Sequence, residues 1–119
     1  MYILLIDDNE DLTDNLKLIL EMEGFTVQAV SSSDEALKAI RQSMPRLIVA
    51  DVLMPGTNGY ELFKQIKADP RAASVSFIFL SALTTTEDIN RGLKLGANEY
   101  ITKPFAIGDL LASIRRYLR

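Results

Sequence analysis

Cysteine and histidine are both absent from the 119-residue sequence. Without cysteine the chain has no disulfide, no thiolate metal site and no cysteine nucleophile, which suits a reducing compartment. Without histidine it has no Ser-His-Asp triad and no imidazole metal site. Any chemistry must therefore use carboxylates, lysines or hydroxyl groups.

Long hydrophobic runs and clustered positive charge are missing as well. The N-terminal apolar run, Tyr2 to Ile6, is too short to be a signal peptide or a membrane span. The formal net charge of −3 argues against a groove for nucleic acid, which needs clustered Lys and Arg. We therefore expect a cytoplasmic chain that contacts neither a membrane nor nucleic acid directly.

Short apolar runs alternate with longer amphipathic stretches along the whole sequence. The runs are mostly rich in β-branched or aromatic residues, which is typical of strands. They are Tyr2 to Ile6, Phe25 to Val30, Leu47 to Ala50, Phe77 to Leu80, and Tyr100 to Ile101. The stretches between them place apolar residues on one helical face. These faces are clearest over residues 12–20, 62–66 and 110–118, shorter over 36–40 and weakest over 89–93.

Helix boundaries have sequence signals of their own. The motifs Ser32-x-x-Glu35 and Thr84-x-x-Glu87 fit capping boxes at the starts of two helices. Gly96 follows a helical pattern at the place where a left-handed residue commonly ends a helix.

The alternation predicts a single α/β domain over residues 1–119. Parallel strands need crossover connections, and a strand that is covered on both faces is apolar throughout. We therefore expect a doubly wound (βα)5 parallel sheet with the flavodoxin-like strand order 2-1-3-4-5. In this order the functional crevice lies at the carboxyl ends of strands 1 and 3.

Polar side chains follow all five runs. The serines after the second run, Ser31 to Ser33, are best explained as a turn and a helix cap, so the candidate site residues follow the other four runs. Asp7 and Asp8 follow the first, Asp51 the third, Ser81 the fourth and Lys103 the fifth. Taken alone, each is explained well enough as a turn residue, a helix cap or a solvated charge. Neighbouring strands lie about 4.8 Å apart, so the carboxylates after strands 1 and 3 should share one small pocket.

These acids would repel one another unless a cation joins them. A hard divalent ion with oxygen ligands resolves the conflict, and Mg²⁺ (or Mn²⁺) suits a few carboxylates plus waters. A metal ion, the Lys103 ammonium and a hydroxyl around one free carboxylate suit phosphoryl transfer, with the carboxylate attacking in line. The sequence therefore predicts a metal-dependent phosphoryl-transfer site.

Four segments resemble, in order and spacing, the receiver domain of bacterial response regulators in two-component signalling. They are LLIDDNED, LIVADVLMPGTNGYEL, FLSAL and GANEYITKPF, and the similarity covers essentially the whole chain. The resemblance implies that Asp51 is the phosphoacceptor and that Asp7 and Asp8 are the acidic pair that holds Mg²⁺. It also implies Asp51 itself and the backbone carbonyl of Leu53 as further metal ligands.

The same resemblance assigns the other site residues. Ser81 is the expected switch hydroxyl, Tyr100 the switch aromatic, and Lys103 the lysine that pairs with the phosphoryl group. The bond between Lys103 and Pro104 is expected to be cis, which is seen in only about 5–6% of X-Pro bonds.

The residues around the site add two expectations. Ala82, next to the expected switch hydroxyl, leaves the site open to a phosphodonor. Leu53 and Leu83 are apolar where many relatives have polar residues. Because apolar side chains position an attacking water poorly, we expect slow loss of the phosphoryl group.

The implied function is a phosphorylation-activated signalling switch and not an enzyme that turns over an external substrate. A sensor histidine kinase or a histidine phosphotransfer protein is the expected phosphodonor. An output domain or downstream protein is the expected target of the face made by helix 4, strand 5 and helix 5. A homodimer on activation is also compatible with the resemblance.

Three other functions fit part of this pattern. A degenerate receiver would bind partners without being modified. A haloacid-dehalogenase-like phosphatase also uses a strand-end Asp and Mg²⁺, but it expects a second Asp where this chain has Leu53. A flavodoxin-like cofactor module needs a Ser/Thr/Gly-rich phosphate loop where this chain has the acidic segment DDNE.

Overall fold

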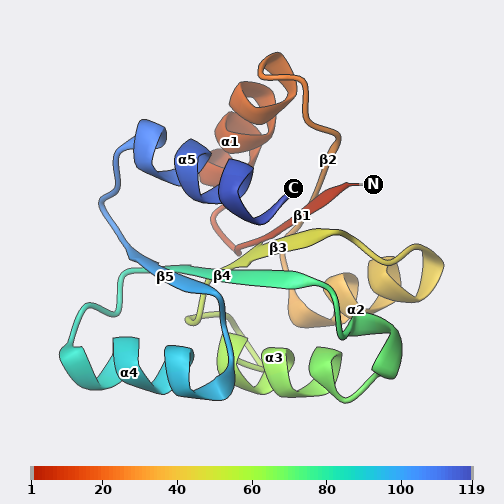
Figure 1. The fold of residues 1–119 in the computed structure, drawn as a ribbon, viewed down its shortest axis with the longest axis vertical. Coiled ribbons are helices and arrows are strands. Elements are labelled where there is room, and N and C mark those ends of the chain that lie inside the picture. The colour runs from red at the N-terminus through yellow and green to blue at the C-terminus, as the bar shows by residue number, and fades with distance from the viewer. Residues whose placement is uncertain (1, 119) are drawn as a thin grey trace.

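The computed structural model describes residues 2–118, in which a five-stranded parallel sheet lies between two layers of helices (Figure 1). The strands are β1 (Ile3–Ile6), β2 (Val27–Val30), β3 (Leu47–Ala50), β4 (Ser76–Ser81) and β5 (Glu99–Thr102). Their order is β2-β1-β3-β4-β5. The predicted α/β class, the doubly wound parallel sheet and the 2-1-3-4-5 order are confirmed. The two ends of the predicted domain, residues 1 and 119, lie outside the described residues.

Helices connect the strands and cover both faces of the sheet. They are α1 (Glu10–Met22), α2 (Ser33–Gln42), α3 (Gly59–Lys67), α4 (Thr86–Leu95) and α5 (Ile107–Tyr117), with a short 3₁₀ helix at Pro70–Ala72. Helices α1 and α5 lie on one face, and α2, α3 and α4 lie on the other (Figure 1). Within residues 2–118, no helix is long and apolar enough to cross a membrane.

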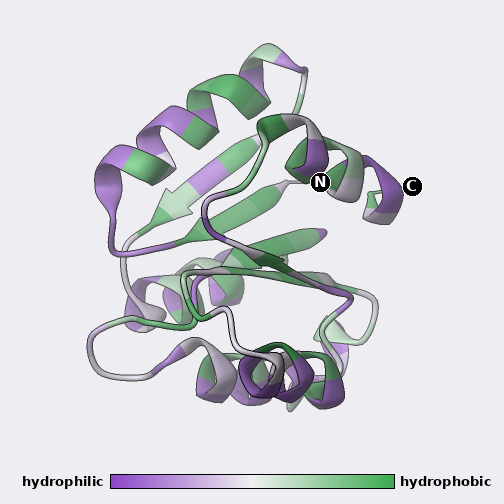
Figure 2. Cartoon of the chain, turned by 90° about the vertical axis from the view of Figure 1, so that its left-hand side faces the viewer, coloured by the Kyte–Doolittle hydropathy of each residue, from purple (hydrophilic) through white to green (hydrophobic). Residues whose placement is uncertain are grey.

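Alternate strand residues point to opposite faces and build two separate cores. In β1, Leu4 and Ile6 pack with residues of α2 and α3, whereas Ile3 and Leu5 pack with residues of α1 and α5. Figure 2 shows strands that are mostly hydrophobic and helices on which hydrophobic and hydrophilic bands alternate. Burial on both faces explains why the strands appear in the sequence as nearly continuous apolar runs.

The helix caps follow the predicted signals with one exception. Ser32 caps α2, and its Oγ accepts a backbone N–H of the first helical turn at 3.1 Å. Gly96 ends α4 with a φ of 119°, as predicted. The predicted cap at Thr84 is wrong by one residue, because Thr85 caps α4 and its Oγ1 accepts the Asp88 N–H at 3.1 Å. Consecutive threonines precede this helix, so the motif alone does not choose between them.

Candidate functional site

The sheet holds the backbone of the residues just past the ends of β3 and β5. The Asp51 N–H donates to the Ile6 carbonyl at 2.9 Å, and the Lys103 N–H donates to the Ser81 carbonyl at 2.8 Å. The inter-strand hydrogen bonds therefore continue one residue beyond each strand. As a result, both side chains start from an ordered backbone and not from a loose loop.

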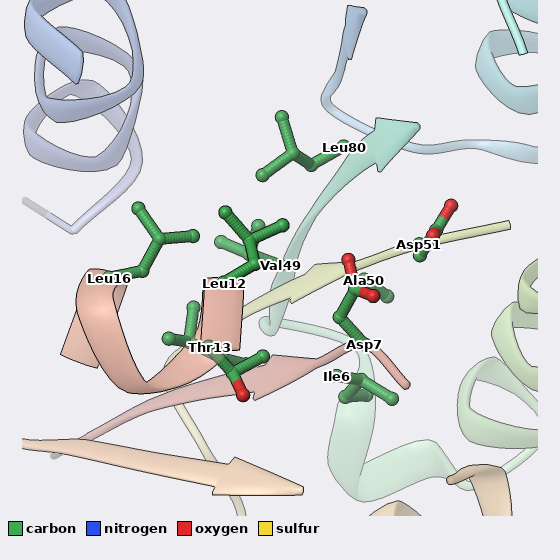
Figure 3. Close-up of a pocket in the computed structure, with 10 residues that line it drawn as sticks. Ile6, Asp7, Leu12, Thr13, Leu16, Val49, Ala50, Asp51 and Leu80 are labelled. Atoms are coloured by element: carbon green, nitrogen blue, oxygen red, sulfur yellow. The ribbon is translucent and has the colours of Figure 1, made fainter. Parts of the chain in front are cut away.

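Three acids meet at the carboxyl ends of β1 and β3. One oxygen from each of Asp7, Asp8 and Asp51 lies within 4.8 Å of the others. Asp7 and Asp51 are buried, with 5% and 7% of their surface exposed, whereas Asp8 is exposed to solvent. Figure 3 shows the Asp7 and Asp51 side chains at the ends of neighbouring strands. The structure thus brings together the three acids that the sequence singled out.

Lys103 places a positive charge beside two of these acids. Its Nζ lies 2.7 Å from Oδ2 of Asp7 and 3.3 Å from Oδ2 of Asp51. Burial opposes the charge of the ammonium, but the hydrogen bond to Asp7 and the charges of both acids outweigh it. The pKa of Lys103 is therefore raised above its ordinary value, and the side chain is cationic at neutral pH. The peptide bond between Lys103 and Pro104 is cis.

Backbone N–H groups orient the two buried carboxylates. The Asn9 N–H donates to Oδ1 of Asp7 at 2.9 Å, and the Leu53 N–H donates to Oδ1 of Asp51 at 3.2 Å. Each carboxylate thus has one oxygen on a backbone donor and the other near Lys103. Leu53 therefore contacts the site through its backbone N–H. The role of its backbone carbonyl as a metal ligand stays a prediction.

Ser81 and Tyr100 both bond to the backbone of Leu83. The Ser81 Oγ accepts the Leu83 N–H at 3.2 Å, and the Tyr100 hydroxyl donates to the Leu83 carbonyl at 2.8 Å. Ser81 is fully buried, and Tyr100 is half-buried with its ring centre 5.9 Å from that of Phe79. The loop between β4 and α4 is therefore tied to both expected switch residues.

Gly59 packs directly against the backbone of Asp51, a contact that the sequence does not predict. A Cβ at Gly59 would collide with the Asp51 carbonyl oxygen and would lie 2.8 Å from Cα of Val52. The Gly59 N–H also donates to the Val52 carbonyl at 2.8 Å. The missing side chain lets α3 begin directly against the loop that carries Asp51. Its only signal in the sequence is a glycine near the start of a helical pattern, which does not identify the contact.

A small apolar cavity lies behind the acids, between α1 and the sheet (Figure 3). Its volume is about 10 Å³, so it holds no substrate, and any reaction must occur on the open side of the carboxylates. Besides Asp7 and Asp51, its lining is mainly apolar and includes Leu12, Leu16, Val49 and Leu80. Such a low-dielectric wall strengthens the attraction between the carboxylates and the lysine.

Comparison with known proteins identifies relatives over nearly the whole chain. The family model of the response regulator receiver domain matches residues 3–115. The DNA-binding response regulator MtrA of Mycobacterium tuberculosis is 37% identical over 117 residues, which are 98% of this chain and 50% of MtrA. The chain therefore spans about half the length of the curated response regulators that it matches first.

Solved structures share the fold at similar levels of identity. The signal receiver domain of a signal transduction histidine kinase from Syntrophus aciditrophicus has a TM-score of 0.90 and 34% identity, over 98% of this chain and 89% of that one. The non-phosphorylated HemR receiver domain from Leptospira biflexa has a TM-score of 0.89 and 32% identity, over 98% and 93%. The chain therefore belongs to the response regulator receiver domain family of two-component signalling.

Proposed function

We propose that this receiver domain is a phosphorylation-activated switch in which Asp51 accepts a phosphoryl group from a phosphohistidine of a partner protein. The observation that carries the proposal is the contact between the Lys103 Nζ and two buried carboxylates, at 2.7 Å to Asp7 and 3.3 Å to Asp51. A cation in this position attracts the Asp51 carboxylate and would lie where the phosphoryl oxygens arrive. The partner would be a sensor histidine kinase or a histidine phosphotransfer protein.

The donor set fits a magnesium ion. Three carboxylate oxygens lie within 4.8 Å of one another, and carboxylates together with waters are the ligands that Mg²⁺ prefers. We propose that Asp7, Asp8 and Asp51, with the Leu53 carbonyl, hold Mg²⁺ or Mn²⁺. When bound, such an ion neutralises negative charge on the oxygens of the transferred group. Asp8 is the exposed member and faces the solvent from which the ion enters.

The proposed reaction is a displacement at phosphorus. A carboxylate oxygen of Asp51 forms the new P–O bond while the P–N bond to the donor imidazole breaks, and the imidazole nitrogen keeps the bonding electron pair. The Leu53 N–H contacts one oxygen of the attacking carboxylate and the Lys103 ammonium contacts the other, so together they orient it. Because the donor supplies the phosphoryl group, the chain needs no ATP site of its own.

The acyl phosphate adds a charge of about −1.5 to −2 at Asp51. This charge would draw the Ser81 hydroxyl and the Lys103 ammonium toward the phosphoryl oxygens. Ser81 would then release the Leu83 N–H, which changes the loop to which the Tyr100 hydroxyl also bonds. Phosphorylation can favour only a conformation that contacts the phosphoryl group better, so the response is a shift between existing populations.

The face made by α4, β5 and α5 would pass this shift to an output domain or a downstream protein. MtrA is described as DNA-binding, and this chain spans half of its length. If the chain is part of a longer protein, we propose a DNA-binding module as its output domain. The receiver domain itself, proposed as one unit over residues 1–119, has a net charge of −3 and would not bind DNA. A cytoplasmic location and a homodimer on activation belong to the same proposal.

Labelling with acetyl phosphate tests the proposed chemistry. In the presence of Mg²⁺ we expect the wild-type chain to gain the mass of one phosphoryl group, and Asp51→Asn to gain none. Asp34→Asn, which changes an exposed acid in the first turn of α2, is the matched control and should label like wild type. Equal labelling of Asp51→Asn and wild type would contradict the assignment. A wild-type chain that never labels would favour the degenerate receiver instead.

A further inference from the structure

Helix α4 packs on the sheet beside β5 and has one buried residue. Among the residues of α4, all of which are described, Gly92 is the buried one. A Cβ at Gly92 would lie 2.8 Å from Cδ2 of Tyr100 and 3.0 Å from Cδ2 of Phe79, closer than van der Waals contact allows. The Tyr100 ring therefore occupies space that a side chain at position 92 would need.

Tyr60, in the first turn of α3, holds α4 from the other side. It is 2% exposed, and its hydroxyl donates to the Asp88 carbonyl of α4 at 2.9 Å. The Tyr60 ring meets the Phe79 ring edge-on, with 5.3 Å between ring centres. The Arg91 guanidinium lies over the Tyr60 ring, 4.5 Å from its centre. Asp88 and Arg91 are both within about one helical turn of Gly92, so Tyr60 anchors this part of α4 to α3.

The hydroxyls of Tyr60 and Tyr100 also interact with each other. Burial raises the pKa of Tyr60, and a hydrogen bond with Tyr100 raises it further. The Tyr60 hydroxyl donates its proton to the Asp88 carbonyl, and the Tyr100 hydroxyl donates its proton to the Leu83 carbonyl. Both rings also pack on Phe79, with ring centres 5.3 Å and 5.9 Å away, so Tyr100 is coupled to α3 as well as to the loop between β4 and α4.

We propose that Gly92 and Tyr60 are positioning residues that set the inward place of the Tyr100 ring. Gly92 admits the ring by having no side chain, and Tyr60 holds the helix that packs on the ring. The inference rests on the proposed role of Tyr100 as the switch aromatic. A side chain at position 92 favours conformations in which α4 or the Tyr100 ring has moved away, and so shifts the population toward an outward Tyr100.

The test uses the whole chain labelled with 3-fluorotyrosine and read by ¹⁹F NMR. The four tyrosines are assigned by single Tyr→Phe variants, and broadening by a soluble gadolinium chelate reports the exposure of each ring. We expect Gly92→Ala to move the Tyr100 resonance toward that of an exposed tyrosine and to increase its broadening several-fold. An unchanged Tyr100 resonance in Gly92→Ala would overturn the proposal.

Gly108→Ala is the matched control, because Gly108 is also helical. Among the described residues, and apart from its chain neighbours and the nearby backbone of its own helix, no atom lies within 4 Å of a Cβ built at Gly108. Alanine favours a helix over glycine, so the effect of helix propensity has the same direction in both variants and cannot by itself explain a displaced Tyr100. We expect Gly108→Ala to leave the Tyr100 resonance in place. We also expect Gly92→Ala to lower the unfolding midpoint, and to lower it less in a Tyr100→Ala background, where only the close contact with Phe79 remains; an equal loss in both backgrounds would count against the steric role of Tyr100.

Tyr60→Phe tests the second positioning residue, since it keeps the ring and removes the hydroxyl. We expect it to shift the Tyr100 resonance in the same direction as Gly92→Ala, but by less. Tyr2→Phe removes a hydroxyl that donates to the Ser43 carbonyl elsewhere and should leave Tyr100 unchanged. A Tyr60→Phe spectrum like that of Tyr2→Phe would remove Tyr60 from the proposal.

Acetyl phosphate labelling separates this proposal from the one on which it rests. The hydroxyl of Tyr60 bonds to the Asp88 carbonyl, and Gly92 faces Tyr100 and Phe79, so neither substitution changes a group that bonds to the three acids. We therefore expect both variants to label at the wild-type level with Mg²⁺. Normal labelling together with an unmoved Tyr100 resonance would overturn the positioning role alone. Absent labelling in the wild type would overturn the phosphoacceptor role, whatever the ¹⁹F spectra show.

Discussion

The Nζ of Lys103 lies 2.7 Å from Oδ2 of Asp7, although 96 positions separate the two residues in the sequence. The contact of Lys103 with Asp51 is longer, at 3.3 Å. In this conformation the lysine therefore pairs most closely with a proposed metal ligand and less closely with the proposed phosphoacceptor. We infer that a metal ion bound at Asp7 would neutralise its charge and weaken the Lys103–Asp7 pair. The Lys103 ammonium would then be free to contact the phosphoryl group.

Replacement of Lys103 by Met should destabilise the chain at neutral pH. The change leaves two buried carboxylates without their cation, and breaking a buried ion pair costs about 3 kcal/mol or more. Urea unfolding measures the loss, and millimolar Mg²⁺ should restore much of it. Lys64→Met is the control, because Lys64 and its partner Glu61 are both about half exposed and such pairs contribute at most about 1 kcal/mol. Equal stability of Lys103→Met and wild type without Mg²⁺ would refute this reading of the pair.

The contribution of Lys103 to stability should disappear only at alkaline pH. Its pKa is raised in the folded chain, so the stabilisation is fully present below the ordinary lysine pKa of about 10.4 and is lost as pH rises through the folded value. The difference in unfolding free energy between wild type and Lys103→Met should therefore start to shrink only above about pH 10. Urea titrations across this range measure it. A difference that shrinks from neutral pH upward would show that the pKa is not raised.

Removal of one exposed acid should weaken metal binding without unfolding the chain. We expect Asp8→Asn to lower the affinity for Mg²⁺ at least about tenfold, because carboxylate charge dominates the binding of hard cations. Isothermal titration calorimetry measures the affinity. Asp11→Asn, another exposed acid in the first turn of α1, should bind Mg²⁺ like wild type. If the two variants bound Mg²⁺ equally well, Asp8 would not be a ligand.

Loss of the Ser81 hydroxyl should impair switching more than phosphoryl uptake. Ser81→Ala keeps Asp51 and Lys103, so we expect it to label with acetyl phosphate in the presence of Mg²⁺. The phosphorylation-induced change in the ¹⁹F resonance of Tyr100 should be largely lost. Ser76→Ala, at the opposite end of β4, should behave like wild type in both measurements. An intact Tyr100 response in Ser81→Ala would contradict the proposed coupling.

The apolar side chain of Leu53 should slow the loss of the phosphoryl group. This side chain is 51% exposed at the site, where a polar group could position an attacking water. We expect Leu53→Gln to lose the phosphoryl group several-fold faster than wild type, as followed by intact mass after removal of acetyl phosphate. Met22→Gln, which changes a 79% exposed residue of α1, is the control. A Leu53→Gln lifetime equal to that of wild type would exclude this role.

The order of the elements could be predicted from the sequence, but several of their ends could not. The second strand was predicted from Phe25, whereas β2 begins at Val27. The Phe25 N–H donates instead to the Leu20 carbonyl and closes the end of α1. The fourth strand is predicted over Phe77 to Leu80, whereas β4 runs from Ser76 to Ser81, because both serines pair with neighbouring strands. Such pairings depend on residues far away in the sequence.

The sequence by itself determined the five-fold alternation of strands and helices and the acids that stand at the strand ends. Apolar periodicity, turn chemistry and capping depend on nearby residues, so they can be read along the chain. Only the tertiary structure decided that Lys103 pairs most closely with Asp7, that Ser81 and Tyr100 bond to Leu83, and that the Tyr100 ring fills the space at Gly92. These contacts depend on strand register and on how closely helices approach the sheet. Both are set by packing between distant segments.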